Sequence, residues 1–248
     1  MDQSKTTYAP ISWDSQGLPH SVVFDDKYFC AENGYEEMVH VSCEGNLLKQ
    51  KFARLDPSVK GVFTIIETGF GTGLNFCCAW GLWDGTAPQS WTLRFVSIEL
   101  YPIAQEDLIR ALSRWPAVEV PAGKLAQQYK PLSEGMTDLY FDGGRVHLTL
   151  VFDDVVAALH TIKNQELVPQ GADAWFLNGF APSKNPRMWS PEVFAAMAPL
   201  SKLNTSLSTF TAAGFVRRGL EEYGFSVMKI KGYGGKKHML AGVYRGGK

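Results

Sequence analysis

A glycine-rich segment is the first place in this chain where residue types and spacing suggest chemistry. It runs Glu67-Thr68-Gly69-Phe70-Gly71-Thr72-Gly73 and directly follows an apolar run. Glycines at alternate positions allow positive φ angles and let the backbone approach a ligand where a Cβ would collide. The alternative is a turn that only reverses the chain, because isolated glycine motifs are weak signals. The residues predicted to border a bound small molecule here are Gly69, Phe70, Gly71, Gly73 and Asn75.

The spacing of these glycines discriminates between nucleotide cofactors. A dinucleotide fingerprint needs G-x-G-x-x-G, so that the pyrophosphate can lie at a helix N-terminus. Here Gly73 arrives one residue early, and the acidic Glu67 stands immediately before the loop. A carboxylate repels pyrophosphate but attracts the ammonium and sulfonium groups of S-adenosylmethionine. The segment therefore favours S-adenosylmethionine, bound in part by Glu67, over a nicotinamide cofactor and its oxidoreductase chemistry.

Two further acidic positions follow apolar runs. Glu99 ends the run 93–99 and lies 26 residues after Gly73 (99 − 73), close to the ~20 residues expected of a carboxylate that binds ribose hydroxyls. Asp153 and Asp154 follow the run 146–152. Asp154 is a candidate acceptor for the adenine amine and equally a candidate N-cap for a helix that begins at Val155.

Short β-branched or aromatic runs alternate with helix-length segments from residue 61 onward, a pattern typical of a mostly parallel sheet. The last two runs are joined by a connection too short for a helix, so they should pair antiparallel. This is the α/β, Rossmann-like fold of class I S-adenosylmethionine-dependent methyltransferases, with seven strands and a terminal antiparallel hairpin. The predicted strands are 62–67, 93–99, 146–152, 174–178, 206–210, 225–230 and 239–244, and the predicted helices are 74–83, 104–115, 155–163, 191–198 and 212–223.

The chain is predicted to hold an N-terminal extension, residues 1–55, and one Rossmann-like domain, residues 56–248. Residues 37–43 and 46–52 flank Glu44-Gly45 and are predicted to form a β-hairpin within the extension. No apolar run approaches the ~18 to 20 residues that span a bilayer. No secretion signal is visible in residues 1–20, so we expect a cytoplasmic protein without a membrane partner. The four cysteines lack CxxC spacing, so no metal site is expected.

Charge is distributed unevenly along the chain. The net charge is −1, from 24 basic and 25 acidic residues. Residues 184–248 hold 11 basic and 3 acidic residues, or +8, which leaves 13 basic and 22 acidic residues, or −9, in residues 1–183. Such a molecule can dock a polyanion on one side, although an accidental asymmetry of a solvated surface is the alternative.

The stretch F-L-N-G-F-A-P-S-K-N-P-R-M-W at residues 176–189 is the most informative in the chain. It resembles the methyltransferase domain of the tRNA 5-methylaminomethyl-2-thiouridine biosynthesis bifunctional protein family, whose pattern is F-L-D-G-F-A-P-x-K-N-P-x-M-W. The resemblance runs almost end to end. Its other blocks are 24–26 with 28–29, 33–34 with 36–37, 69–76, 209–211 and 213–220.

The resemblance implies methyl transfer from S-adenosylmethionine to the amine of 5-aminomethyl-(2-thio)uridine at the tRNA wobble position. It also implies a partner, because in the family a flavin-dependent oxidase domain follows and produces that amine. The other partner is the tRNA anticodon stem-loop. Residues 203–205 replace a Pro-Gly-Gly turn of the family, and Arg187 replaces an acidic residue; either departure is expected to shift the substrate rim, or Arg187 adds a phosphate contact.

Asn178 stands where the resemblance implies a catalytic aspartate, and it is the predicted catalytic residue. An aspartate there can bind the substrate ammonium or take its proton, whereas an amide oxygen accepts a hydrogen bond but holds no proton. Three hypotheses follow. Asn178 suffices to orient the amine while water takes the proton; or the rate falls by ~10²-fold or more; or the chain is an inactive homologue that binds tRNA or a partner.

The substrate is expected to meet aromatic and basic side chains. A base that reaches a buried methyl donor must be splayed out of its stack, and aromatic rings can hold it, although aromatic residues are more often core. The candidates for stacking are Phe180, Trp189 and Tyr233. The candidates for phosphate contacts are Lys184, Arg217, Arg218, Lys236 and Lys237, for each of which a solvated cation is the alternative.

Overall fold

The computed structural model describes residues 8–30, 33–131 and 134–247. Within these residues eight strands form a central sheet in the order β10-β11-β9-β8-β4-β5-β7-β6, in which β11 and β6 run antiparallel to their neighbours. The fold predicted from the sequence is therefore confirmed. The strands are β4 (Gly61–Glu67), β5 (Trp91–Ile98), β6 (Gly135–Phe141), β7 (Val146–Phe152), β8 (Ala172–Phe176), β9 (Ser201–Thr209), β10 (Phe225–Lys231) and β11 (His238–Tyr244).

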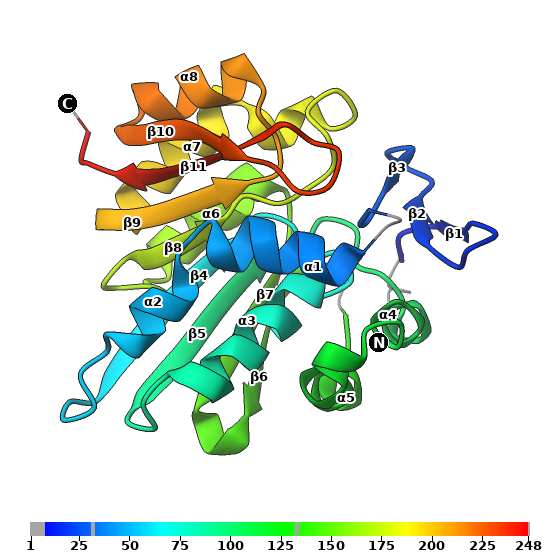
Figure 1. The fold of residues 1–248 in the computed structure, drawn as a ribbon, viewed down its shortest axis with the longest axis horizontal. Coiled ribbons are helices and arrows are strands. Elements are labelled where there is room, and N and C mark those ends of the chain that lie inside the picture. Colours follow the sequence, from blue (N-terminus) through cyan, green and yellow to red (C-terminus); the bar gives the residue numbers. More distant parts are fainter. Residues whose placement is uncertain (1–7, 31–32, 132–133, 248) are drawn as a thin grey trace, which may run out of the picture.

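Helices cover both faces of the sheet, and alternate side chains of each strand point to opposite faces (Figure 1). Ile65 packs on the face that carries α3 and Ile66 on the face that carries α6, as the two-residue period of a strand requires. The first face holds α1 (Gly34–Met38), α2 (Leu48–Ala53), α3 (Leu74–Thr86) and α5 (Glu119–Gln128), with α4 (Gln105–Leu112) beside α5. The second holds α6 (Val155–Asn164), α7 (Pro191–Met197) and α8 (Gly214–Glu222).

The strand β6 was missed by the sequence analysis. It lies at the sheet edge and pairs with β7 alone, so one of its sides faces solvent. Its burial alternates only over its last residues, and Asp138 and Thr137 dilute the apolar pattern. An edge strand with few buried positions leaves a weak periodic signal.

The predicted hairpin over residues 37–52 is wrong, because this segment is helical. It forms α1, a π-helical turn at Val39–Glu44, and α2. Asn33 caps α1 by accepting a hydrogen bond from the Glu36 N–H at 3.1 Å. Gly45 is not a turn glycine: a Cβ there would lie 2.4 Å from the carbonyl oxygen of Val41 and 2.8 Å from the Cβ of Ser208. It is glycine because the chain passes close to β9.

The strands of the N-terminal segment lie earlier than predicted. Among the described residues, β1 (Ile11–Trp13), β2 (Pro19–Ser21) and β3 (Asp26–Lys27) form a small antiparallel sheet. Trp13 ties it to α4, because its indole N–H donates to Asp107 at 3.3 Å and its ring lies 3.9 Å from the Arg110 guanidinium carbon. Residues 1–7 and 31–32 of the predicted extension lie outside the described part. The division at residue 55 remains a prediction.

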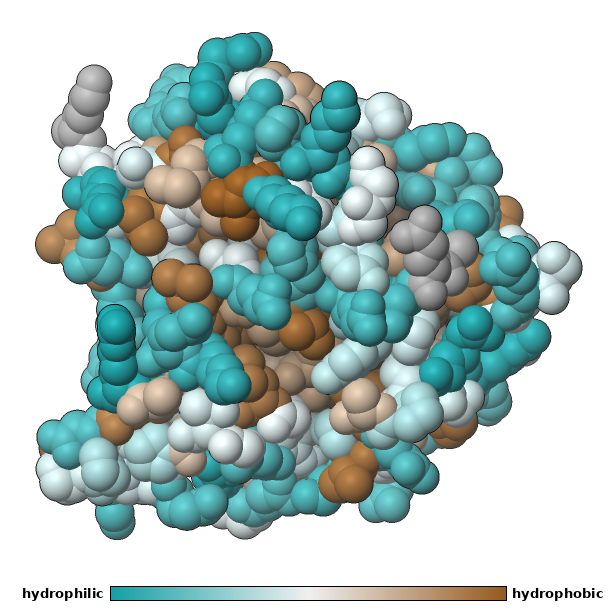
Figure 2. All heavy atoms as spheres, in the orientation of Figure 1, coloured by the Kyte–Doolittle hydropathy of each residue, from teal (hydrophilic) through white to brown (hydrophobic). Residues whose placement is uncertain are grey.

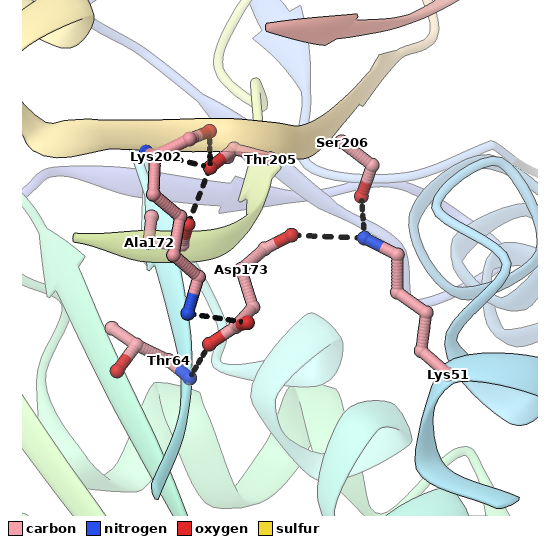
Figure 3. Close-up of polar contacts among 7 residues, drawn as sticks. All are labelled: Lys51, Thr64, Ala172, Asp173, Lys202, Thr205 and Ser206. Carbon is pink, nitrogen blue, oxygen red and sulfur yellow. Dashed lines mark hydrogen bonds and ion pairs between the residues drawn. The ribbon is translucent and has the colours of Figure 1, made fainter. Parts of the chain in front are cut away.

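A partly buried lysine fastens α2 to the sheet (Figure 3). Lys51 Nζ donates to the Asp173 carbonyl oxygen at 2.9 Å and to Ser206 Oγ at 2.7 Å. The carboxylate of Asp173 accepts from the Thr64 N–H and pairs with Lys202 at 2.7 Å. These bonds join four elements: α2, β4, β8 and β9.

Residues 203–205 lie inside β9 rather than in a turn before it. Asn204 has a φ of +68°, and the register between β8 and β9 shifts at Ala172. The Thr205 hydroxyl accepts from the Lys202 N–H and shares its single proton between the carbonyl oxygens of Ala172 and Lys202, which closes this bulge (Figure 3). This departure from the family pattern therefore lies at the amino-terminal end of β9, and the prediction that it shifts the substrate rim is wrong.

The described surface mixes polar and apolar side chains. On the face that Figure 2 shows, apolar patches are interspersed among polar residues. None of the described helices combines the length and the apolar content that crossing a membrane requires.

Candidate active site

A cavity of about 720 Å³ opens at the carboxyl ends of β4, β5 and β8. The chain leaves β4 toward β5 on one side and later returns to β8 on the other, so the cavity lies where the strand order reverses. Ligands of open α/β sheets bind at this position. The predicted site residues that line the cavity are Gly69, Phe70, Gly71, Asn75, Glu99, Asp154, Asn178, Phe180 and Lys236.

The glycine loop connects β4 to α3 in a conformation that requires glycine. Gly71 and Gly73 have φ angles of +54° and +76°. A Cβ on Gly69 would lie 3.0 Å from the carbonyl oxygen of Asn178, and one on Gly71 would lie 3.3 Å from the Tyr28 ring. Gly69 and Gly71 therefore leave the cavity wall free of side chains at these two positions. Gly73 does not line the cavity and is the N-cap residue of α3.

Glu99 follows β5 and holds the glycine loop in place. Its Oε2 accepts from the Gly71 N–H at 2.8 Å, and its Oε1 accepts from the Tyr101 N–H at 2.9 Å. Burial raises the pKa of this carboxyl, and the backbone hydrogen bonds oppose the rise. Each carboxylate oxygen keeps a further lone pair, so Glu99 can accept additional hydrogen bonds from a ligand in the cavity.

Asp154 has two protein partners. Its Oδ1 caps α6 by accepting from the Val156 N–H at 3.2 Å, which confirms the predicted cap. Its Oδ2 pairs with the Nε of Arg187 at 3.0 Å. Both side chains line the cavity, so the departure at position 187 places a cation beside the acid predicted to bind adenine.

Asn178 follows β8 and is 7% exposed. Its carbonyl accepts from the Thr68 hydroxyl at 2.8 Å, which ties it to the glycine loop. Its side-chain Nδ2 donates to Ser42 Oγ at 3.3 Å. Sequence analysis missed Ser42, because it is 136 residues away along the chain and lies in the segment predicted to be a hairpin.

Glu67 is fully buried and does not line the cavity. Burial raises the pKa of its carboxyl to about 8, while hydrogen bonds from Ser97, Asn75 and Asn178 oppose the rise. The Oε1 atom accepts from Asn75 at 2.8 Å and the Oε2 atom from Ser97 at 2.6 Å. Glu67, which was predicted to contact the cofactor, therefore lies behind the residues that line the cavity.

An aromatic cluster borders the cavity around Phe180. The Phe180 ring stacks on Phe24 with 4.7 Å between centroids and meets Tyr28 edge-on at 5.3 Å. Phe24 also contacts Tyr101 at 5.8 Å. Sequence analysis named only Phe180, although Phe24 and Tyr28 belong to the conspicuous block at residues 24–29 and were available as a signal.

The two other predicted stacking residues have structural partners. Trp189 is 3% exposed and its indole N–H donates to the Phe180 carbonyl oxygen at 3.0 Å. Trp189 therefore holds the loop after β8 from the protein interior, and because its ring is buried it is not available to stack on a base. The Tyr233 hydroxyl donates to Glu36 at 2.8 Å, and Tyr233 does not line the cavity.

The predicted phosphate contacts are dispersed. Lys236 lines the cavity, pairs with the buried Glu37 at 3.0 Å and lies 4.8 Å from the Phe210 ring centroid. Lys184 does not line the cavity but pairs at 2.6 Å with Asp25, which does. The remaining three also lie outside the cavity: Lys237 in the exposed loop between β10 and β11, and Arg217 and Arg218 on α8.

The described residues contain no group of three histidine, cysteine or acidic side chains arranged to hold a metal ion. Cys77 and Cys78 are buried within α3. Among the described side chains, the cavity is lined by carboxylates, amides, aromatic rings and the basic residues His20, Lys27, Arg187 and Lys236.

Comparisons with known proteins agree with this geometry. Residues 117–245, just over half of the chain, match a family described as S-adenosyl-L-methionine-dependent methyltransferase. The chain is 46% identical over 239 residues to the tRNA 5-methylaminomethyl-2-thiouridine biosynthesis bifunctional protein MnmC of Pseudomonas syringae pv. syringae, and 47% identical to that of Pseudomonas paraeruginosa. These alignments cover 96% of this chain but 35% of each relative, so the chain spans about a third of their length.

A solved structure shows the same fold. MNMC2 from Aquifex aeolicus superposes with a TM-score of 0.66 at 19% identity, over 96% of this chain and 71% of that one. The chain belongs to the family of S-adenosyl-L-methionine-dependent methyltransferases.

Proposed function

We propose that this chain methylates the primary amine of 5-aminomethyl-(2-thio)uridine at the wobble position of tRNA. The curated relatives named above support the proposal, because their names place them in the biosynthesis of 5-methylaminomethyl-2-thiouridine in tRNA. The observation that carries it is the position of Asn178, a neutral acceptor between the glycine loop and an aromatic rim. The second activity of the bifunctional relatives is proposed to come from the flavin-dependent oxidase partner that the resemblance implies.

The cavity residues suit S-adenosylmethionine. Gly69 and Gly71 line the cavity without side chains, and a Cβ at either position would press on the Asn178 carbonyl or the Tyr28 ring. We assign the ribose hydroxyls to the free lone pairs of Glu99 and the adenine amine to Asp154, with Asn75 in the cavity wall beside the loop. When bound, the cofactor would supply a methyl group carried on a sulfonium. Transfer breaks the S–CH3 bond, forms a new N–C bond and leaves the sulfur as a neutral thioether.

The protein contributes orientation and not proton abstraction. The attacking amine must be neutral, so its ammonium form has to lose one proton before the N–C bond forms. Asn178 cannot hold a proton, and we assign the proton to water at the cavity mouth. The Asn178 side chain accepts an amine N–H and aligns the lone pair, and such positioning supplies much of the catalysis in a two-substrate reaction.

Aromatic and basic side chains at the mouth suit a splayed-out base. Phe180, stacked on Phe24, offers a ring face beside the cavity. Base-on-ring stacking contributes about 1–3 kcal/mol per base in single-stranded nucleic acid binding. Phosphates flanking the base are assigned to Lys236 at the cavity wall and to Lys184, Arg217, Arg218 and Lys237 around it.

The proposal is tested by methyl transfer to tRNA isolated from cells that accumulate 5-aminomethyl-2-thiouridine. We expect labelled methyl to appear in that tRNA and, after digestion, in the nucleoside heavier by one methylene. The control substrate is tRNA whose wobble uridine is unmodified, which offers no amine. Labelling of both tRNAs alike, or of neither, would contradict the proposed substrate.

A further inference from the structure

A buried chain of hydrogen bonds runs from Glu67, at the end of β4, to Asn178 in the cavity wall. Asn75 Nδ2 donates to Glu67 Oε1 at 2.8 Å, and Ser42 Oγ donates to Asn75 Oδ1 at 3.0 Å. Ser42 Oγ then accepts from Asn178 Nδ2 at 3.3 Å, and the Asn178 side chain also donates to Glu67. These four side chains are each at most 7% exposed, so little water competes for the bonds.

Glu67 sets the donor-to-acceptor direction of this series of hydrogen bonds. Its recorded partners Asn75, Ser97 and Asn178 all donate to it, so both of its oxygens act as acceptors in this network. The Asn75 amide must therefore turn its nitrogen to Glu67, which leaves its oxygen for Ser42. The single Ser42 proton serves that oxygen, so Ser42 Oγ can only accept from the next group, and that group is the nitrogen of Asn178.

We propose that Glu67, Asn75 and Ser42 are positioning residues that hold the Asn178 amide with its oxygen Oδ1 turned to the cavity. The Asn178 nitrogen is occupied by Ser42 and Glu67, and among the described residues no donor is recorded for Oδ1. This inference rests on the proposed function, because it assigns Oδ1 to an N–H of the substrate amine.

The orientation of the amide decides whether the amine can react. An amine that donates an N–H to Oδ1 keeps its lone pair free for the methyl carbon. The reversed amide would present an N–H to the cavity, and that group would donate to the lone pair and block the nucleophile. A neutral asparagine can thus orient an amine productively only if its neighbours fix which end faces the substrate.

Removal of the Ser42 hydroxyl tests this inference in kinetics. We expect Ser42→Ala to lower kcat about tenfold, the equivalent of one net hydrogen bond, with cofactor affinity unchanged. The same change in an Asn178→Ala background should lower kcat no further, because the group that Ser42 orients is gone. Equal losses in both backgrounds, or no loss in the first, would overturn the inference.

A matched control separates positioning from folding. Ser208 is also buried, and its Oγ accepts from the Asn46 amide nitrogen at 2.6 Å, but it does not line the cavity. Ser208→Ala should therefore destabilise the fold about as much as Ser42→Ala in thermal unfolding and leave kcat at the wild-type value. A drop in kcat equal to that of Ser42→Ala would show that loosened packing explains both.

A measurement without substrate keeps the inference testable if the tRNA assay fails. In the free protein, the side-chain amide protons of Asn178 should exchange slowly with solvent by NMR, and Ser42→Ala should accelerate that exchange while Ser208→Ala does not. Rapid exchange in the wild-type protein would overturn the orientation. Slow exchange in a protein that methylates no tRNA would retain the orientation and reject the proposed substrate.

Discussion

Glu99 combines two tasks at the residue scale. It accepts N–H groups from Gly71 and Tyr101, and it faces the cavity with lone pairs to spare. Replacing it with glutamine keeps the size of the side chain but turns one acceptor into a donor, which then meets a backbone N–H or a ribose hydroxyl with the wrong polarity. We propose that this single carboxylate couples the shape of the glycine loop to cofactor binding.

We therefore expect Glu99→Gln to weaken binding of S-adenosylmethionine by about tenfold to a hundredfold, since hydrogen bonds to charged groups contribute about 1.5–3 kcal/mol each. Isothermal titration calorimetry of the purified variant measures the loss. Glu106→Gln, an exposed glutamate near the start of α4, is the matched control and should bind like the wild type. Equal affinities of the Glu99 variant and the control would remove Glu99 from the ribose site.

Sequence alone could predict those site residues that sit next to a recognisable strand end. The glycine loop, Glu99 and Asn178 each follow a strand, and the topology brings their ends together. Ser42 and Glu37 could not be found this way, because they lie on helical segments far from their partners in the sequence. Ser42 bonds to Asn178, 136 residues away, and Glu37 bonds to Lys236, 199 residues away. Glu67 was predicted to touch the cofactor, but its side chain turns to the buried network instead.

At the scale of elements, α2 is attached to the sheet through a lysine whose charge is costly to bury. Burial lowers the pKa of Lys51 from 10.5 to about 8, and the charge of Asp173 opposes the shift. Between these two pH values the unfolded chain holds a proton at this position that the folded protein has released. The contribution of Lys51 to the free energy of unfolding therefore increases as pH rises from about 8 to about 10.5.

Lys51→Met should abolish this contribution. The free energy of unfolding of the wild type minus that of the variant should rise with pH across this window, by at most about 3 kcal/mol. Urea denaturation at a series of pH values measures the difference. Lys49→Met, an exposed lysine on the same helix, controls for general loss of charge and should give a difference independent of pH. A pH-independent difference for Lys51→Met as well would contradict the burial of a charged group there.

Prediction of the elements succeeded where periodicity and length agreed. The buried parallel strands and the helices α6 and α8 have strong patterns over enough residues, whereas α3 has almost no amphipathic periodicity and is marked only by the glycine loop before it. The segment 34–53 misled because its two short helices flank Glu44-Gly45, a pair that resembles a hairpin turn. Gly45 is required by a tertiary contact, the close packing of this segment against β9, and the local sequence contains no signal for that contact.

At the scale of the whole molecule, the uneven charge gives the proposed tRNA-binding surface its expected salt dependence. Lys237 and Arg218 are exposed and lie outside the cavity, whereas Lys236 is paired with Glu37 in the cavity wall. The structure therefore separates two adjacent lysines that the sequence treated alike. Of the two proposed phosphate contacts, Lys236 already has Glu37 as an ion-pair partner, whereas Lys237 lies outside the cavity.

We expect Lys237→Gln and Arg218→Gln each to reduce the slope of log affinity for tRNA against log salt by about 1, without changing cofactor affinity. Filter binding over a range of salt concentrations gives the slope. Lys49→Gln, in the acidic part of the chain, should leave it unchanged. If Lys49→Gln lowers the slope as much as the other two variants, the binding surface is not the one proposed.

The central claim is that the cavity between the glycine loop, Glu99 and Asn178 brings a methyl donor and an RNA amine together. A crystal structure with S-adenosylhomocysteine, the product of methyl transfer, tests it most directly. The account predicts the ribose hydroxyls within hydrogen-bond distance of the Glu99 carboxylate and the sulfur on the side of the cavity that Asn178 lines. A ligand found elsewhere on the molecule, or in this cavity with its sulfur turned away from Asn178, would contradict it.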